Sequence, residues 1–150
     1  MFLDWVLASA HHLAVFTLAA ILAFELALTA GALDASTISR LARVDAWYGA
    51  TAALVLGAGA ARVFLGAKGP EYYGANSLFW TKMALFAAVG AISILPTMRY
   101  IVWRRALRAD AGFRPDAAAV RVVRRALWSE VALFAFIPLA AAGMARGYGI

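Results

Sequence analysis

The chain has 150 residues, of which 65% are hydrophobic and only 15% are charged, and its formal net charge is +6. Soluble domains are nearer half apolar and a quarter charged, so this composition excludes an ordinary water-soluble fold. The chain has no cysteine, which excludes disulfides, iron–sulfur clusters and thiolate zinc sites. In so apolar a chain, excess arginine usually sets membrane topology, and we expect no nucleic-acid partner.

Four apolar stretches are long enough to cross a lipid bilayer, which takes about 20 predominantly apolar residues. In chain order they cover approximately residues 5–31, 45–66, 77–102 and 126–144. Together with their short connections they take up nearly the whole chain. We therefore predict an all-α membrane protein, a single domain over residues 1–150 that folds as an antiparallel bundle of four transmembrane helices.

The basic residues predict how the four spans are oriented. Ten of the 14 Lys and Arg residues fall on the side of the first and third connecting loops, and four fall on the side of the termini and the second loop. Because Lys and Arg are enriched on the cytoplasmic side, we expect the first and third loops in the cytoplasm and both termini outside. The expected location is the bacterial inner membrane.

Polar residues inside the spans form an outer layer. The stretch "SAHHL", residues 9–13, places His11 and His12 roughly 10 Å below the outer surface at 1.5 Å per residue. Arg62 near the end of the second span and Lys82 near the start of the third lie at a similar depth. Ionisable groups at membrane depth are functional candidates, because lipid cannot solvate them. The second loop lies above this layer and adds Tyr72, Tyr73 and Asn76.

The two histidines cannot both face the centre of the bundle, because neighbouring helix residues point about 100° apart. His11 is in line with Glu25 along the first helix, whereas His12 points elsewhere. We expect one of them to face a site and the other to bond locally or to reach the interface. A purely structural histidine pair is the alternative.

A second polar layer is expected near the cytoplasmic side. Its members are Glu25, Asp45, Arg99 and Glu130, with Arg43 close by. Two interpretations are open: the acids pair with the two arginines as an inner charge cluster, or Glu25 has a proton-handling role, because burial disfavours an ionised carboxylate.

Small residues recur every four positions in the second span. This stripe consists of Gly49, Ala53, Gly57 and Ala61. Such stripes let transmembrane helices approach closely, and they would equally leave room for a flat macrocycle.

Several stretches together resemble an uncharacterised bacterial family of four-helix membrane proteins, a domain of unknown function. The resemblance covers nearly the whole chain and rests on "AHHLAVFTLAAILAFEL", "RVDAWYGATAALVLGAGAARVF", "KGPEYYGANSLFWTKMALF" and "SILPTMRYIVWRR". The family is more distantly similar to the HemJ protoporphyrinogen oxidases and to CopD-type copper-resistance membrane domains.

The similarity to HemJ implies a haem b site. Its essential His-Leu pair matches His12 and Leu13, and its functional lysine matches Lys82 in "FWTKM". By this resemblance His12 is the expected axial ligand of the haem iron, with His11 as the alternative. Lys82 is expected to be a second ligand or to contact a propionate or substrate.

These observations predict a haem b (porphyrin)-binding redox protein with its site near the outer face. Arg62 and Lys82 would neutralise the propionates, and Tyr72, Tyr73 and Asn76 would form a lid. Electrons would be exchanged with a quinol, a porphyrinogen or a partner membrane subunit, and a HemJ-like membrane oxidoreductase activity is left open. The alternatives are a non-enzymatic subunit or accessory protein of a larger membrane complex, and a CopD-like metal-handling protein. Homo-oligomerisation is also open.

Overall fold

The computed structural model describes residues 2–150 and is helical, with no strand in that range. The helices are α1 (Phe2–Leu28), α2 (Ala35–Leu65), α3 (Gly69–Ala75), α4 (Ser77–Ala109) and α5 (Ala117–Ala145). All but α3 are long and apolar enough to cross a membrane. The predicted fold class, an all-α membrane protein with a four-helix bundle, is confirmed.

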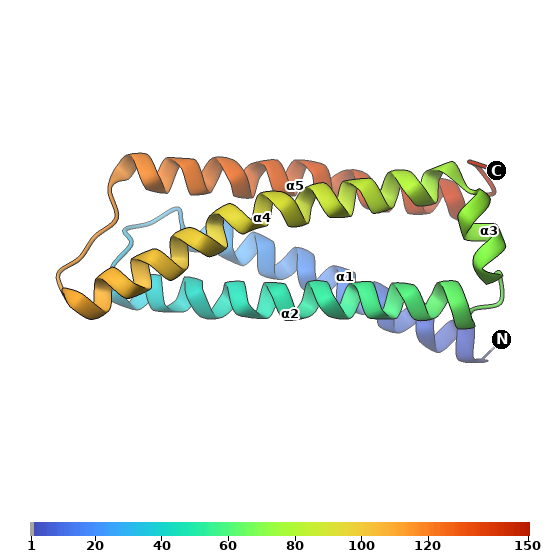
Figure 1. Cartoon of the computed structure of the whole chain (residues 1–150), viewed down its shortest axis with the longest axis horizontal. Helices are drawn as coiled ribbons and strands as arrows, with labels where there is room; N and C mark the ends of the chain where they lie inside the picture. The colour runs from blue at the N-terminus through green and yellow to red at the C-terminus, as the bar shows by residue number, and fades with distance from the viewer. Residues whose placement is uncertain (1) are drawn as a thin grey trace.

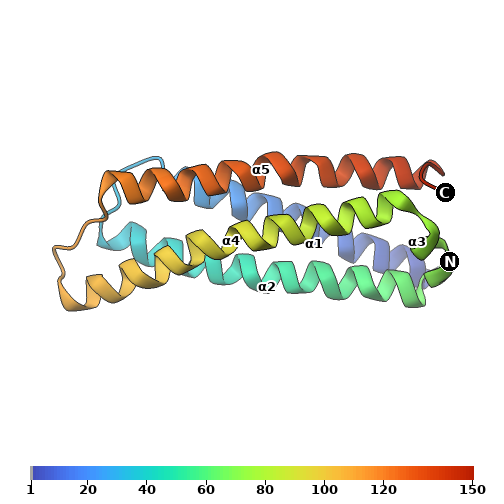
Figure 2. The same ribbon diagram turned by 45° about the horizontal axis from the view of Figure 1, so that its top comes forward.

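The four long helices run antiparallel to one another in chain order (Figure 1). α1 packs mainly against α2 and α4 against α5, while smaller contacts between α2 and α4 and between α1 and α5 close the ring. Both termini and α3 lie at one end, which we call the α3 end (Figure 2). The connections 29–34 and 110–116 lie at the opposite end, which we call the loop end.

α2 and α5 begin well before the predicted apolar stretches, because polar caps rather than hydropathy fix where these two helices begin. The Asp34 carboxylate accepts from the Thr37 backbone amide and begins α2 at Ala35. The Asp116 carboxylate caps α5 in the same way, and α4 runs on to Ala109. α3 was not expected from the sequence. It begins at Gly69, whose positive φ of 73° is a backbone conformation that glycine adopts without steric cost.

The apolar core is packed most completely toward the loop end. Leucine and isoleucine side chains with almost no exposure fill it, namely Leu18, Leu22, Ile38, Leu41 and Leu127. Many large apolar side chains are exposed around the outside of the bundle. Such an exterior suits contact with lipid tails, so a bilayer is the environment that this fold requires.

The stripe of small residues on α2 faces outward. Gly49, Ala53 and Gly57 are exposed, and a Cβ added at either glycine would meet no atom within 4 Å. Within residues 2–150 the stripe therefore brings no neighbouring helix close and makes no room for a macrocycle.

Candidate cofactor cavity

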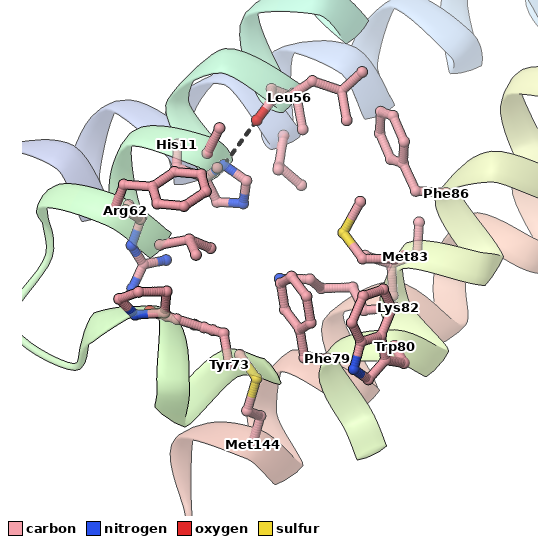
Figure 3. A pocket seen from close by; sticks show the side chains of 18 of the residues that line it. His11, Leu56, Arg62, Tyr73, Phe79, Trp80, Lys82, Met83, Phe86 and Met144 are labelled. Atoms are coloured by element: carbon pink, nitrogen blue, oxygen red, sulfur yellow. Dashed lines mark hydrogen bonds between the residues drawn. The ribbon is translucent and has the colours of Figure 1, made fainter. Parts of the chain in front are cut away.

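A cavity of about 520 Å³ lies inside the bundle at the α3 end, and all five helices contribute to its lining (Figure 3). This volume is typical of sites for small molecules and cofactors, which measure about 300–1,000 Å³. Most of the lining is apolar or aromatic. It includes Leu56 and Phe64 of α2 and Trp80 of α4, all exposed, so the cavity opens sideways between these two helices.

His11 presents one ring nitrogen to this cavity. Its Nδ1 lies 3.2 Å from the Val55 carbonyl oxygen. Because a carbonyl can only accept, Nδ1 carries the proton and Nε2 keeps a free lone pair. Figure 3 shows Nε2 turned toward the cavity. Gly59 makes room for the ring, since a Cβ there would lie 3.2 Å from His11 Cε1.

The cavity is also electropositive. Arg62 and Lys82 reach it from α2 and α4, respectively (Figure 3). Arg62 Nε is buried without a hydrogen-bond partner, and Lys82 Nζ lies 5.4 Å from the centre of the Phe79 ring. Among the residues that the structure describes, no acidic side chain lines the cavity. The site is therefore suited to an anion that carries a large apolar body.

The structure separates the two histidines. His12 is exposed, and its Nδ1 bonds to the Ala8 carbonyl oxygen one turn back at 2.7 Å. It does not line the cavity. The residue brought together with Arg62 and Lys82 is therefore His11, which the sequence left as the alternative.

The residues predicted to form a lid have two different positions. Tyr73 is buried and lines the cavity. Tyr72 instead donates to the Met144 carbonyl oxygen at 2.9 Å, and Asn76 caps α4 and donates to the Tyr148 carbonyl oxygen at 3.0 Å. Tyr72 and Asn76 therefore fasten α3 and the start of α4 to the end of the chain, outside the cavity.

Sequence reasoning missed several residues of the cavity because they carry no charge. The Val55 carbonyl and Gly59 orient His11, and Met83, Phe86 and Phe134 build the wall. A signal was present on α2, because Val55, Gly59 and Arg62 follow one another at helical spacing and so share one face.

The inner acidic residues do come together, but without the arginines predicted to pair with them. Glu25 and Glu130 are 2% and 1% exposed. Arg43 and Arg99 are exposed, and no ion pair joins them to either carboxyl group in the described part of the chain. The exposed Arg43 and Arg99 therefore do not support the arginine-paired interpretation within the described residues, and the role of the inner acids stays a prediction.

No group of three or more His, Asp or Glu residues suited to a metal ion occurs within residues 2–150. The inner acids therefore do not form a metal centre of that kind.

Comparison with known proteins identifies one family. Residues 3–149 match the family model described as "Predicted membrane protein (DUF2214)". This match confirms the resemblance to an uncharacterised family of membrane proteins. No curated protein and no solved structure matches the chain, so its similarity to HemJ and to CopD-type domains stays a prediction.

Proposed function

The chain belongs to the DUF2214 family of predicted membrane proteins, and we propose that it binds haem b in the cavity at the α3 end, with His11 as the axial ligand. The observation that carries the proposal is the hydrogen bond between His11 Nδ1 and the Val55 carbonyl oxygen. Histidine ligands of metals generally donate their second ring N–H to such a partner, which fixes the ring and leaves the other nitrogen free to ligate.

The charges of the cavity support the same ligand. In the described part of the chain Arg62 and Lys82 have no acidic neighbour in the lining, and the rest of the wall is largely apolar and aromatic. Two carboxylates on a flat apolar ring complement this arrangement, so Arg62 and Lys82 bind the propionates. A bare metal cation would be repelled by the same two residues, which argues against CopD-like copper handling.

When bound, the haem supplies one-electron redox chemistry, with a potential set by its axial ligand and the local dielectric. The chain's own residues hold it and exclude water. The opening between α2 and α4, bordered by Leu56, Phe64 and Trp80, faces the lipid. A quinol or a porphyrinogen in the bilayer reaches the site through this opening, and the activity is that of a membrane oxidoreductase.

We place the α3 end outside the cell and the loop end in the cytoplasm of a bacterium, with the bundle in the inner membrane. The support is the charge distribution, because ten of the 14 basic residues lie toward the loop end. The haem site then lies in the outer half of the membrane.

An absorption spectrum tests the proposal. The wild-type protein, purified in mild detergent, is expected to show a Soret band that shifts on reduction with dithionite. His11→Ala should lose this band because the ligand is removed, whereas the matched variant His12→Ala should retain it. Both histidines lie on α1, so the pair controls for general effects of losing an imidazole in this helix.

Two results would contradict the proposal. A colourless preparation, even after expression with a haem precursor, would exclude haem and favour an accessory subunit of a larger membrane complex. Loss of the band in His12→Ala with retention in His11→Ala would move the ligand to the lipid-facing histidine.

A further inference from the structure

A second polar site lies inside the bundle, toward the loop end. Glu25 of α1 and Glu130 of α5 are almost fully buried, and the Oε1 atom of each has no hydrogen-bond partner among residues 2–150. Tyr100 of α4 is 0% exposed, and its hydroxyl group also has no partner. Unpaired buried polar groups are costly, and three of them in one region indicate a ligand that satisfies them.

Every helix that packs around this site contributes a polar group to it. From α2, Tyr48 donates to Glu130 Oε2 at 3.2 Å, and Asp45 accepts from Thr97 of α4 at 2.7 Å. The Tyr100 hydroxyl lies within electrostatic range of Glu25, Asp45 and Glu130. The site therefore holds three acids from three different helices.

Arg124 of α5 is the basic residue that points toward α1 near this site, and it does not neutralise the acids. Arg124 directs Nη1 to the Leu26 carbonyl oxygen at 3.4 Å and to Thr29 Oγ1 at 3.3 Å. Glu25 and Glu130, in mutual electrostatic range, cannot both stay ionised in an apolar bundle without a counter-charge. A single proton removes one of the two charges and supplies a donor for an unpaired oxygen.

A groove connects this site to the surface at the loop end. It measures about 260 Å³ and is lined by Asp45 and Tyr100 on its inner side and by the exposed arginines Arg104, Arg105 and Arg108. Water in this groove reaches the partly exposed Asp45, and the buried Tyr100 lies between the groove and the pair. The groove therefore links the buried pair to the loop end of the bundle through these two residues.

We propose that Glu25 and Glu130 form a proton-binding site inside the bundle, loaded from the loop end through the groove at Asp45 and Tyr100. The proton comes from water in the groove and is held between the two carboxyl groups, with no change of oxidation state. The site does not depend on what occupies the cavity at the α3 end.

Infrared spectroscopy of the full chain in lipid nanodiscs tests the proposal. At neutral pH the wild-type protein is expected to show the C=O stretching band of a protonated carboxyl group, and this band should shift in D₂O. Glu25→Gln and Glu130→Gln should each lose the band. The matched control is Glu71→Gln, which removes an exposed carboxyl group on α3 and should leave the band unchanged.

The route is tested by Tyr100→Phe, which removes only the hydroxyl group. We expect the band to remain and its exchange in D₂O to slow about tenfold, because the variant removes the polar group that lies between the groove and the buried pair, at a cost of about 1.4 kcal/mol in the barrier.

Several results would overturn the proposal. Absence of the band in the wild type at neutral pH would exclude the bound proton. A band that appears only when Na⁺ and K⁺ are removed would assign the site to a metal cation. A band that never exchanges in D₂O would show that no path reaches the pair. The wild-type measurements decide these points even if a glutamate variant fails to fold.

Discussion

The two ends of this bundle carry polar sites of opposite charge and opposite packing. Within residues 2–150, Arg62 and Lys82 at the α3 end line an open cavity without an acid, and Glu25 and Glu130 at the loop end are enclosed without an ion pair. Membrane proteins usually pair such charges with one another. Here they are kept apart, so each site retains its attraction for a ligand: an anion at one end and a proton at the other.

Packing accounts for the difference in access. Leucine and isoleucine side chains from α1, α2 and α5 fill the loop end and leave no large space around the acids. At the α3 end Gly59 lacks a side chain where the His11 ring lies, and the exposed residues Phe64 and Trp80 form part of the wall. The cavity at the α3 end is therefore reached from the side, through lipid. The acidic site is reached from the loop end, through water.

The largest expected effect on stability distinguishes the filled end from the hollow one. Leu22→Ala should lower the free energy of unfolding by about 2–4 kcal/mol, because it opens a cavity in a packed core where Leu22 is 2% exposed. Met83→Ala removes a side chain of similar size that already borders the cavity, and it should cost less than about 1 kcal/mol. Equilibrium unfolding in mixed micelles measures both variants. Equal losses would show that the two ends are packed alike.

A smaller effect is expected from filling the space beside His11. Gly59→Ile should displace the imidazole, because a Cβ at this position already lies close to the ring. Overpacking of this kind costs about 1–3 kcal/mol of free energy, which corresponds to a haem affinity weakened roughly 5- to 150-fold. The matched control is Gly57→Ile, because a Cβ at that glycine meets no atom within 4 Å. Haem titration followed by the Soret band measures both affinities. If Gly57→Ile weakened binding as much as Gly59→Ile, the cavity would not be the site.

The smallest expected effect is on the pH dependence of stability, and it concerns Asp34, a carboxyl group at the loop end that is exposed where Glu25 and Glu130 are buried. The hydrogen bond from the Thr37 backbone amide lowers the pKa of Asp34 from 3.8 to about 2. The stabilisation by the ionised cap is therefore fully present above pH 3.8 and is lost as the pH falls through about 2. Asp34→Asn keeps a capping oxygen but does not titrate. The difference in unfolding midpoint between wild type and Asp34→Asn should change only across this pH range, and a constant difference would contradict the assignment.

The depth of the polar residues was predictable from the sequence alone. Counting positions along each span placed His11, Arg62 and Lys82 in one layer and Glu25, Asp45 and Glu130 in another, because the rise per residue of a helix is fixed. The cavity and the inner acidic site contain these groups. The helix ends were less predictable, since Asp34 and Asp116 cap helices that begin in polar sequence.

By itself, then, the sequence determined a membrane bundle of four long helices, the family to which it belongs and the height of each ionisable group. Only the tertiary structure decided that His11 and not His12 faces the cavity, and that Arg99 does not reach the inner acids. The physical reason is rotation about the helix axis. A span that is apolar on all sides does not specify which face turns inward, so contacts with the neighbouring helices fix that face.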